Sequence, residues 1–177
     1  WANSLFEDNA EHGLGMYLGY MAEQERAAIK AQALIDSNDA DDAAKLAAKN
    51  WLEARNDAQA SKETAAALVT ALEADGSDLA KSLLEDKSFF TKKSFWILGG
   101  DGWAYDIGYG GLDHVIASKE NVNIFVFDTE VYSNTGGQSS KASRLGQVAQ
   151  FAAAGKDIKK KSLSEIAMTY GYVYVAQ

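Results

Sequence analysis

Glycine and aspartate gather where a short apolar run meets a helical pattern, and this point could bind a phosphate. Gly99, Gly100, Asp101 and Gly102 directly follow the run 94–98. Glycine lets the backbone turn tightly and approach a ligand, and the start of a helix offers free N–H groups to a phosphate. Because a carboxylate repels a phosphate, Asp101 predicts a bridging cation, for which Mg²⁺ is the economical choice. The alternative is that Asp101 only caps the helix.

A second polar segment, 128–138, follows the next apolar run and should reach the same edge of the sheet. Its oxygen donors include Thr129, Ser133, Asn134, Thr135 and Gln138. Asn and Gly tolerate left-handed backbone, so main-chain carbonyls here can turn toward an ion. Thr129 follows Asp101 by 28 residues, one strand–helix–strand unit. If the two share one Mg²⁺, we expect their side-chain oxygens to lie within about 10 Å of each other.

The elements that must position these segments alternate between strand and helix. Apolar and β-branched runs predict strands at 94–98, 122–127 and 172–175, and helical patterns follow at 104–118 and after Ser162. This order predicts an α/β fold with a parallel sheet, flanking helices and right-handed crossovers. Ligands of such sheets bind beyond the carboxyl ends of the strands, which is where both polar segments fall.

The first 93 residues are acidic and rich in helix formers, and apolar stripes predict consecutive helices there. We divide the chain into an entry segment and helix (1–35), a helical insertion (36–93) and a strand–helix core that carries the site (94–177). The apolar faces of 36–80 are mostly alanine, so each buries little area. We interpret this stretch as an insertion packed on the main domain, with a partner-binding role as the alternative.

Composition excludes several classes of protein. The chain has 177 residues, 47% hydrophobic and 24% charged, as globular domains do. It contains no cysteine, which excludes disulfides and cysteine-held zinc or iron–sulfur clusters within it. A net charge of -8 argues against nucleic acid and anionic membranes as partners. Because it begins with Trp1 and lacks proline, we expect an internal segment of a longer protein.

The polar segments also carry a resemblance. Gly100, Asp101 and Gly102, with Asp128 and Thr129 one structural unit later, are similar to the diphosphate and magnesium motif of thiamine diphosphate enzymes. The longer strings 99–114 and 127–141, together with 1–10, resemble pyruvate:ferredoxin (flavodoxin) oxidoreductases, also called pyruvate synthases. The resemblance spans the whole chain and is weakest over 36–80. Residues 142–146 depart from the Thr-Pro sequence of many relatives.

The resemblance implies a thiamine diphosphate-binding fold, of which residues 1–177 form a part, and a set of site residues. Those implied to ligate Mg²⁺ are Asp101, Thr129 and the main-chain carbonyl of Val131. Those implied to bind the cofactor are the same three with Gly100, Gly102, Trp103, Ala104, Asn134, Asn3 and Phe6. Asn134 would lie near the thiazolium ring and the substrate, so it is the catalytic candidate.

The activity implied by the same resemblance is oxidative decarboxylation of pyruvate with coenzyme A to acetyl-CoA and CO₂, with reduction of ferredoxin or flavodoxin. The thiamine-activating glutamate and the cysteines of the [4Fe–4S] clusters would lie outside this segment, which should therefore be inactive alone. We expect a homodimer in the cytoplasm, or in a hydrogenosome or similar organelle of a eukaryote, without nucleic acid or membrane partners.

Two other functions remain open. A magnesium-dependent phosphoryl-transfer domain would use Asp128 as nucleophile, although such sites usually have a second Asp where this chain has Glu130. A non-catalytic helical interaction module would leave 94–141 unexplained. The basic cluster of Lys156 and 159–161 is interpreted as a solvated loop, and a site for coenzyme A phosphates is the alternative.

Overall fold

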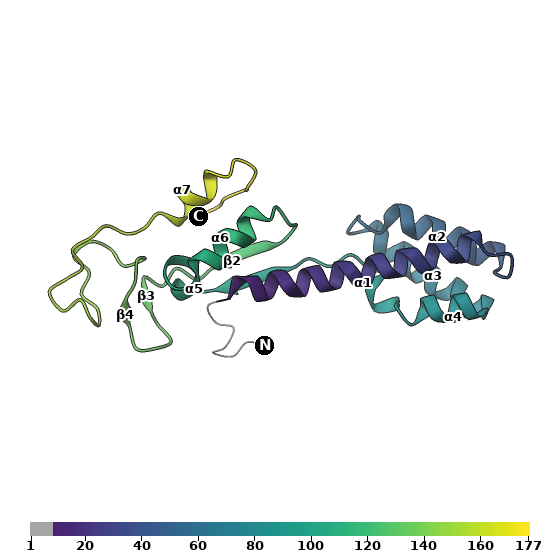
Figure 1. The fold of residues 1–177 in the computed structure, drawn as a ribbon, viewed down its shortest axis with the longest axis horizontal. Helices are drawn as coiled ribbons and strands as arrows, with labels where there is room; N and C mark the ends of the chain where they lie inside the picture. Colours follow the sequence, from purple (N-terminus) through teal and green to yellow (C-terminus); the bar gives the residue numbers. More distant parts are fainter. Residues whose placement is uncertain (1–8) are drawn as a thin grey trace. The chain divides into compact units, whose positions relative to one another are not determined.

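The computed structural model describes residues 9–177, and the chain forms two compact units (Figure 1). One unit comprises Tyr17–Ser94, and the other comprises the residues up to Met16 together with Phe95–Gln177. Asn3 and Phe6, which the resemblance implies to bind the cofactor, lie outside the described residues. No helix in the described part of the chain is long and apolar enough to cross a bilayer.

The unit Tyr17–Ser94 consists of helices with alanine-lined faces. They are the later turns of α1 (Ala10–Asp36), then α2 (Asp42–Ala54), α3 (Ala60–Asp75), α4 (Asp78–Leu84) and the short 3-10 helix η1 (Lys87–Phe89). Ala, Leu, Lys and Glu dominate these segments and favour helix, so the helices predicted for the first half are confirmed. Small alanine side chains at the contacts allow close approach of the helices.

A buried apolar core lies within this helical unit. Its members with no more than 1% exposure include Ala31, Leu34, Ala48, Trp51, Leu68, Leu72, Leu83 and Phe90. The indole Nε1 of Trp51 donates to the carbonyl of Phe90 at 2.7 Å, and the two ring centroids lie 5.1 Å apart. One tryptophan therefore fills the centre of the core and satisfies a buried carbonyl at the same time.

The segment after α4 is bonded back to α1. Asp86 is buried and pairs with Arg26 at 2.7 Å and with Lys30 at 2.8 Å. The hydroxyl of Tyr20 donates to the carbonyl of Thr91 at 2.6 Å. These contacts fix the last residues of the helical unit before the chain enters the other unit.

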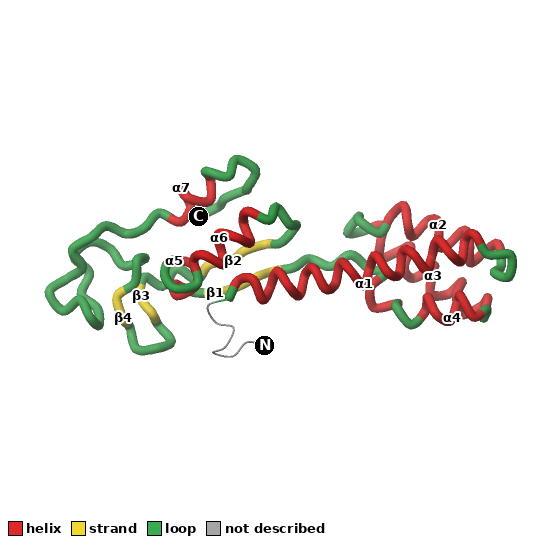
Figure 2. The backbone as a smooth tube through the Cα atoms, viewed as in Figure 1, coloured by secondary structure: helices red, strands yellow, loops and turns green. Residues whose placement is uncertain are grey.

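The other unit is a small mixed α/β structure (Figure 2). After residue 94 its elements are β1 (Trp96–Gly99), α5 (Asp101–Tyr105), α6 (Tyr109–Ala117), β2 (Asn123–Val126), β3 (Val131–Tyr132), β4 (Gln138–Ser139) and α7 (Leu163–Met168). Strands β1 and β2 pair in parallel with Gly99 opposite Val126. The parallel pairing predicted for 94–98 and 122–127 is therefore confirmed, and both strands end at one edge.

The first turns of α1 pack on β1 through a glycine. A Cβ placed on Gly13 would lie 2.8 Å from Cγ1 of Ile97, so a larger residue would push the helix from the strand. Ile97 is buried by this contact.

The helix predicted over 104–118 is wrong, because the structure has two helices there with a break at Asp106. The side chain of Asp106 accepts hydrogen bonds from the amide of Lys141 at 3.2 Å and from its ammonium at 2.8 Å. The amides of Asp106 and Gly108 both donate to the carbonyl of Gly102. A distant lysine and the low helix propensity of glycine together end α5 early.

The strand predicted at 172–175 is also wrong, since this segment has no regular secondary structure. The hydroxyl of Tyr172 instead donates to the carbonyls of Ile116 and Ala117, at 3.3 and 3.2 Å. A strand requires a neighbouring strand for its hydrogen bonds, and the parallel sheet of the described residues contains β1 and β2 alone. The short antiparallel pair β3 and β4 was not predicted; it lies in and just after the second polar segment.

We predict that Trp51→Phe destabilises the helical unit by about 1–3 kcal/mol, because the carbonyl of Phe90 loses its buried donor. Leu46→Ala on the same helix is the control, since Leu46 is 60% exposed and should change stability by less than about 0.5 kcal/mol. Urea unfolding followed by helical circular dichroism measures both. Equal midpoints for the two variants would contradict the role given to Trp51.

Candidate functional site

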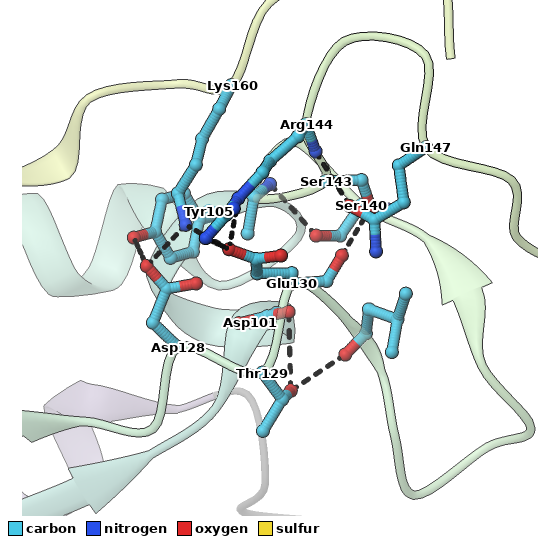
Figure 3. Close-up of polar contacts among 12 residues, drawn as sticks. Asp101, Tyr105, Asp128, Thr129, Glu130, Ser140, Ser143, Arg144, Gln147 and Lys160 are labelled. Atoms are coloured by element: carbon cyan, nitrogen blue, oxygen red, sulfur yellow. Dashed lines mark hydrogen bonds and ion pairs between the residues drawn. The ribbon is translucent and has the colours of Figure 1, made fainter. Parts of the chain in front are cut away.

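The two polar segments meet at the edge where β1 and β2 end (Figure 3). The hydroxyl oxygen of Thr129 lies 3.4 Å from Oδ2 of Asp101 and 2.9 Å from the carbonyl oxygen of Val131. Asp101 begins the helix that follows β1, and Thr129 stands in the turn that follows β2. The predicted proximity of Asp101 and Thr129 is therefore confirmed, and the carbonyl of Val131 joins them.

Asp101 is a buried carboxylate with an incomplete set of partners. Asp101 is 3% exposed, and its buried Oδ1 atom receives no hydrogen bond. Burial, and then the negative charge of Asp128, raise the pKa of Asp101 to about 6. An unpaired buried carboxylate oxygen is costly, and a cation would remove that cost. The chemistry of this site therefore fits the cation predicted from the sequence.

The neighbouring carboxylates of Asp128 and Glu130 differ from Asp101 because each is paired with a cationic side chain. Oδ2 of Asp128 accepts from Lys160 at 2.6 Å and from the hydroxyl of Tyr105 at 2.8 Å. Oε1 of Glu130 lies 2.7 Å from both Nε and Nη2 of Arg144. Of the three carboxylates in this cluster, Asp101 is the one without an ion-pair partner among the described residues.

The donor set around Asp101 suits magnesium. It offers one carboxylate, one hydroxyl and one main-chain carbonyl, and Mg²⁺ commonly takes its other oxygens from water and phosphate. Among residues 9–177 there is no group of three or more His, Cys, Asp or Glu that could hold a metal by itself. A metal at this site would therefore need water or a bound molecule to complete its coordination.

The turn before α5 requires glycine at its first position. A Cβ on Gly99 would lie 1.1 Å from Nε1 of Trp103, so the indole occupies the space a side chain would need. The amide of Ala104 donates to the carbonyl of Gly100 at 3.2 Å. The preceding amides of α5, including Gly102, have no intrahelical carbonyl to bond with. The side chains of Trp103 and Ala104 are buried, which leaves their backbone for any ligand contact.

Asn134, the catalytic candidate, lies in a different turn from Asp101 and Thr129. Asn134 is exposed in the turn between β3 and β4. The structure brings together Asp101, Thr129 and Val131, and it places the catalytic candidate on a separate turn.

The interpretation of the basic cluster as a solvated loop is wrong for three of its lysines. Lys156 is 8% exposed and donates to the carbonyls of Ser140 and Ser143. Lys160 pairs with Asp128, and the ammonium of Lys161 lies 3.1 Å from the ring centroid of Tyr109. Lys159 is exposed. Sequence analysis missed these contacts because the partners lie far away along the chain, and only the clustering of lysines pointed to the segment.

Comparison with known proteins identifies relatives of the chain. A family described as "Thiamine pyrophosphate enzyme, C-terminal TPP binding domain" matches residues 80–177. A pyruvate:ferredoxin oxidoreductase of Moorella thermoacetica is 54% identical over 99% of this chain and 16% of its own length. A pyruvate-flavodoxin oxidoreductase of Klebsiella pneumoniae is 52% identical over 100% of this chain and 15% of its own length. The NADP(+) pyruvate dehydrogenase of Euglena gracilis is 42% identical over 99% of this chain and 10% of its own length. The chain thus spans a small part of each relative.

We predict that Asp101→Asn stabilises the metal-free protein above pH 6, because it removes, at nearly constant volume, a buried charge that has no ion-pair partner among the described residues. The pKa of Asp101 is raised to about 6, above the ordinary value near 4. Its contribution to stability is therefore complete below about pH 4 and is lost as the pH rises through about 6. The variant lacks this loss.

Thermal unfolding of wild type and Asp101→Asn, both metal-free, is measured between about pH 4 and pH 8. The difference in melting temperature between them should grow with pH and then level off. Glu165→Gln on α7 is a control for removal of an exposed carboxylate. Parallel pH profiles for wild type and Asp101→Asn would refute the assignment of an unpaired charge to Asp101.

Proposed function

The chain belongs to the thiamine pyrophosphate enzymes through their C-terminal TPP-binding domain, and on that premise we propose that it binds thiamine diphosphate through Mg²⁺. The observation that carries the proposal is the buried Oδ1 of Asp101, which lacks a donor while Asp128 and Glu130 have protein cations. Asp101, the hydroxyl of Thr129 and the carbonyl of Val131 would ligate the metal. The diphosphate and water would complete its shell.

The other residues of the site would position the cofactor. The backbone of Gly100, Gly102, Trp103 and Ala104, where β1 passes into α5, would contact the diphosphate. Thiamine diphosphate supplies the carbanion chemistry needed to decarboxylate a 2-oxoacid. The buried indole of Trp103 packs on Gly99 and would keep the turn in shape and water out.

Three further residues are assigned more remote roles in the same proposal. Asn134 would face the thiazolium ring and the substrate. Asn3 and Phe6 would line the same pocket. These assignments are supported by the resemblance of 1–10 and 127–141 to the oxidoreductase family.

For the whole protein we propose a 2-oxoacid oxidoreductase that converts pyruvate and coenzyme A to acetyl-CoA and CO₂. Relatives named for pyruvate with ferredoxin and with flavodoxin support this. Ferredoxin or flavodoxin would accept the electrons, since relatives named for each of these carriers match the chain with similar identity. The [4Fe–4S] clusters would be held outside this segment, which has no cysteine. We propose a cytoplasmic homodimer with its other domains in the same polypeptide.

The organisation of the segment is part of the proposal. We keep the division into an entry helix (1–35), a helical insertion (36–93) and a cofactor-binding core (94–177). The boundary between Ser94 and Phe95 supports the start of the cofactor-binding core, whereas the entry helix from Tyr17 onward lies in the helical unit and contributes to its core. The phosphoryl-transfer alternative is disfavoured because Oδ2 of Asp128 is engaged by both Lys160 and Tyr105.

We predict that Thr129→Val in the full-length enzyme weakens Mg²⁺-dependent binding of thiamine diphosphate by about tenfold or more. The variant keeps the volume of the side chain but removes a ligand oxygen, and the loss of even an indirect metal contact commonly costs about that much. Titration calorimetry with saturating Mg²⁺ measures the affinity for the cofactor.

Thr135→Val is the matched control, because the hydroxyl of Thr135 bonds to Gln138 in the neighbouring turn. It should bind the cofactor as the wild type does. If the unsubstituted enzyme shows no Mg²⁺-dependent binding, the proposed function is wrong. If both threonine variants bind normally, the ligand role of Thr129 is wrong.

A further inference from the structure

Glu130 stands between two proposed metal ligands in an unusual backbone conformation. Its φ of 67° lies in the left-handed region, which is unfavourable for a residue with a Cβ. The chain bends at this residue, and the carbonyl oxygen of Val131 lies 2.9 Å from the hydroxyl oxygen of Thr129. The arrangement of these two oxygens therefore depends on a conformation that Glu130 does not prefer.

The segment 140–144 holds Glu130 at both its side chain and its backbone (Figure 3). Nε and Nη2 of Arg144 both lie 2.7 Å from Oε1 of Glu130, and Lys160 approaches the same oxygen at 3.7 Å. The hydroxyl of Ser143 donates to the carbonyl of Glu130. A side-chain contact and a carbonyl contact from one short segment restrict rotation of this residue.

The segment that holds Glu130 is itself fixed by a buried cation. The ammonium of Lys156 donates to the carbonyls of Ser140 and Ser143 at 2.8 and 2.7 Å. The amide of Ser140 donates to the hydroxyl of Ser143 at 3.0 Å, and Ala142 and Ser143 are fully buried. Arg144 and the hydroxyl of Ser143 are therefore presented from a well-bonded turn.

We propose that Ser143 and Arg144 are positioning residues for the metal site, which act by holding Glu130 in its left-handed conformation. Through Glu130 they keep the hydroxyl of Thr129 and the carbonyl of Val131 facing one another. The carboxylate of Glu130 serves as an attachment point and is not a metal ligand. This inference rests on the proposed function, because it assigns a role in holding Mg²⁺.

A different role for Glu130 would be simple electrostatic attraction of the cation. Glu130→Ala and Glu130→Gly remove the same carboxylate, so attraction by charge predicts equal losses. The two variants differ in backbone preference, because glycine adopts positive φ readily and alanine does not. A backbone role therefore predicts that the glycine variant retains the affinity that the alanine variant loses.

The experiment measures the apparent dissociation constant of Mg²⁺ in the full-length enzyme with thiamine diphosphate present, by titration calorimetry. We expect Glu130→Ala to raise this dissociation constant about tenfold, which corresponds to the cost of the left-handed conformation for a residue with a Cβ. Glu130→Gly should raise it less than about threefold, because glycine adopts this conformation readily. Arg144 is 73% exposed, so Arg144→Gln should cost only about threefold, as exposed ion pairs do. In the Arg144→Gln background, Glu130→Gly should cause no further loss.

Arg55→Gln is the matched control, because Arg55 pairs with Glu25 at 2.8 Å within the helical unit. Equal losses in Glu130→Ala and Glu130→Gly, with normal binding by the wild type, overturn this inference alone. Absence of Mg²⁺-dependent binding in the wild type overturns the proposed function and this inference with it. Should Glu130→Ala not fold, the comparison of Arg144→Gln with the double variant decides, since a further loss in the latter contradicts the backbone role.

Discussion

The unpaired carboxylate of Asp101 is the constraint on which the rest of the site depends. A buried charge without a partner costs several kcal/mol, and here the cost appears as a pKa raised to about 6. Lys160 and Arg144 pair with the adjacent Asp128 and Glu130, whereas Asp101 has no ion-pair partner among the described residues. The segment thus keeps a locally destabilising charge where the proposed cofactor site needs one, a conflict between stability and function that active sites commonly show.

Parallel pairing explains why so small a sheet can create this site. Because Gly99 lies opposite Val126, both strands end at one edge of the sheet, which brings the two turns together. The long segment after β4 then contributes what the strands cannot. It provides Arg144 and Lys160 for the carboxylates, and Lys156 to hold its own turn. The strands bring the two turns together, and the loop sets the charge balance of the carboxylates and, in our proposal, orients the Thr129 and Val131 oxygens through Glu130.

The sequence predicted the features that follow from periodicity and parallel geometry. Apolar stripes are enough to locate the helices of Tyr17–Ser94, and the ends of parallel strands must coincide, which brought Asp101 to Thr129. It failed where one contact distant in sequence decides the local structure. The bond from Lys141 breaks the helix at Asp106, and Lys160 reaches Asp128 across 32 residues. The segment 172–175 has the composition of a strand, but strand formation depends on a neighbour that composition does not reveal.

The donor set also implies that the metal and the diphosphate would bind together. One carboxylate, one hydroxyl and one carbonyl form an incomplete shell for Mg²⁺, which prefers about six oxygens, so the metal alone would be held weakly. A diphosphate alone would meet the negative charge of Asp101 and be repelled. Each ligand removes the obstacle to the other, and because coupling between binding sites is reciprocal, the affinity of either must rise when the other is present. The missing partner of Asp101 would thus be supplied together with the phosphate oxygens that complete the metal's coordination.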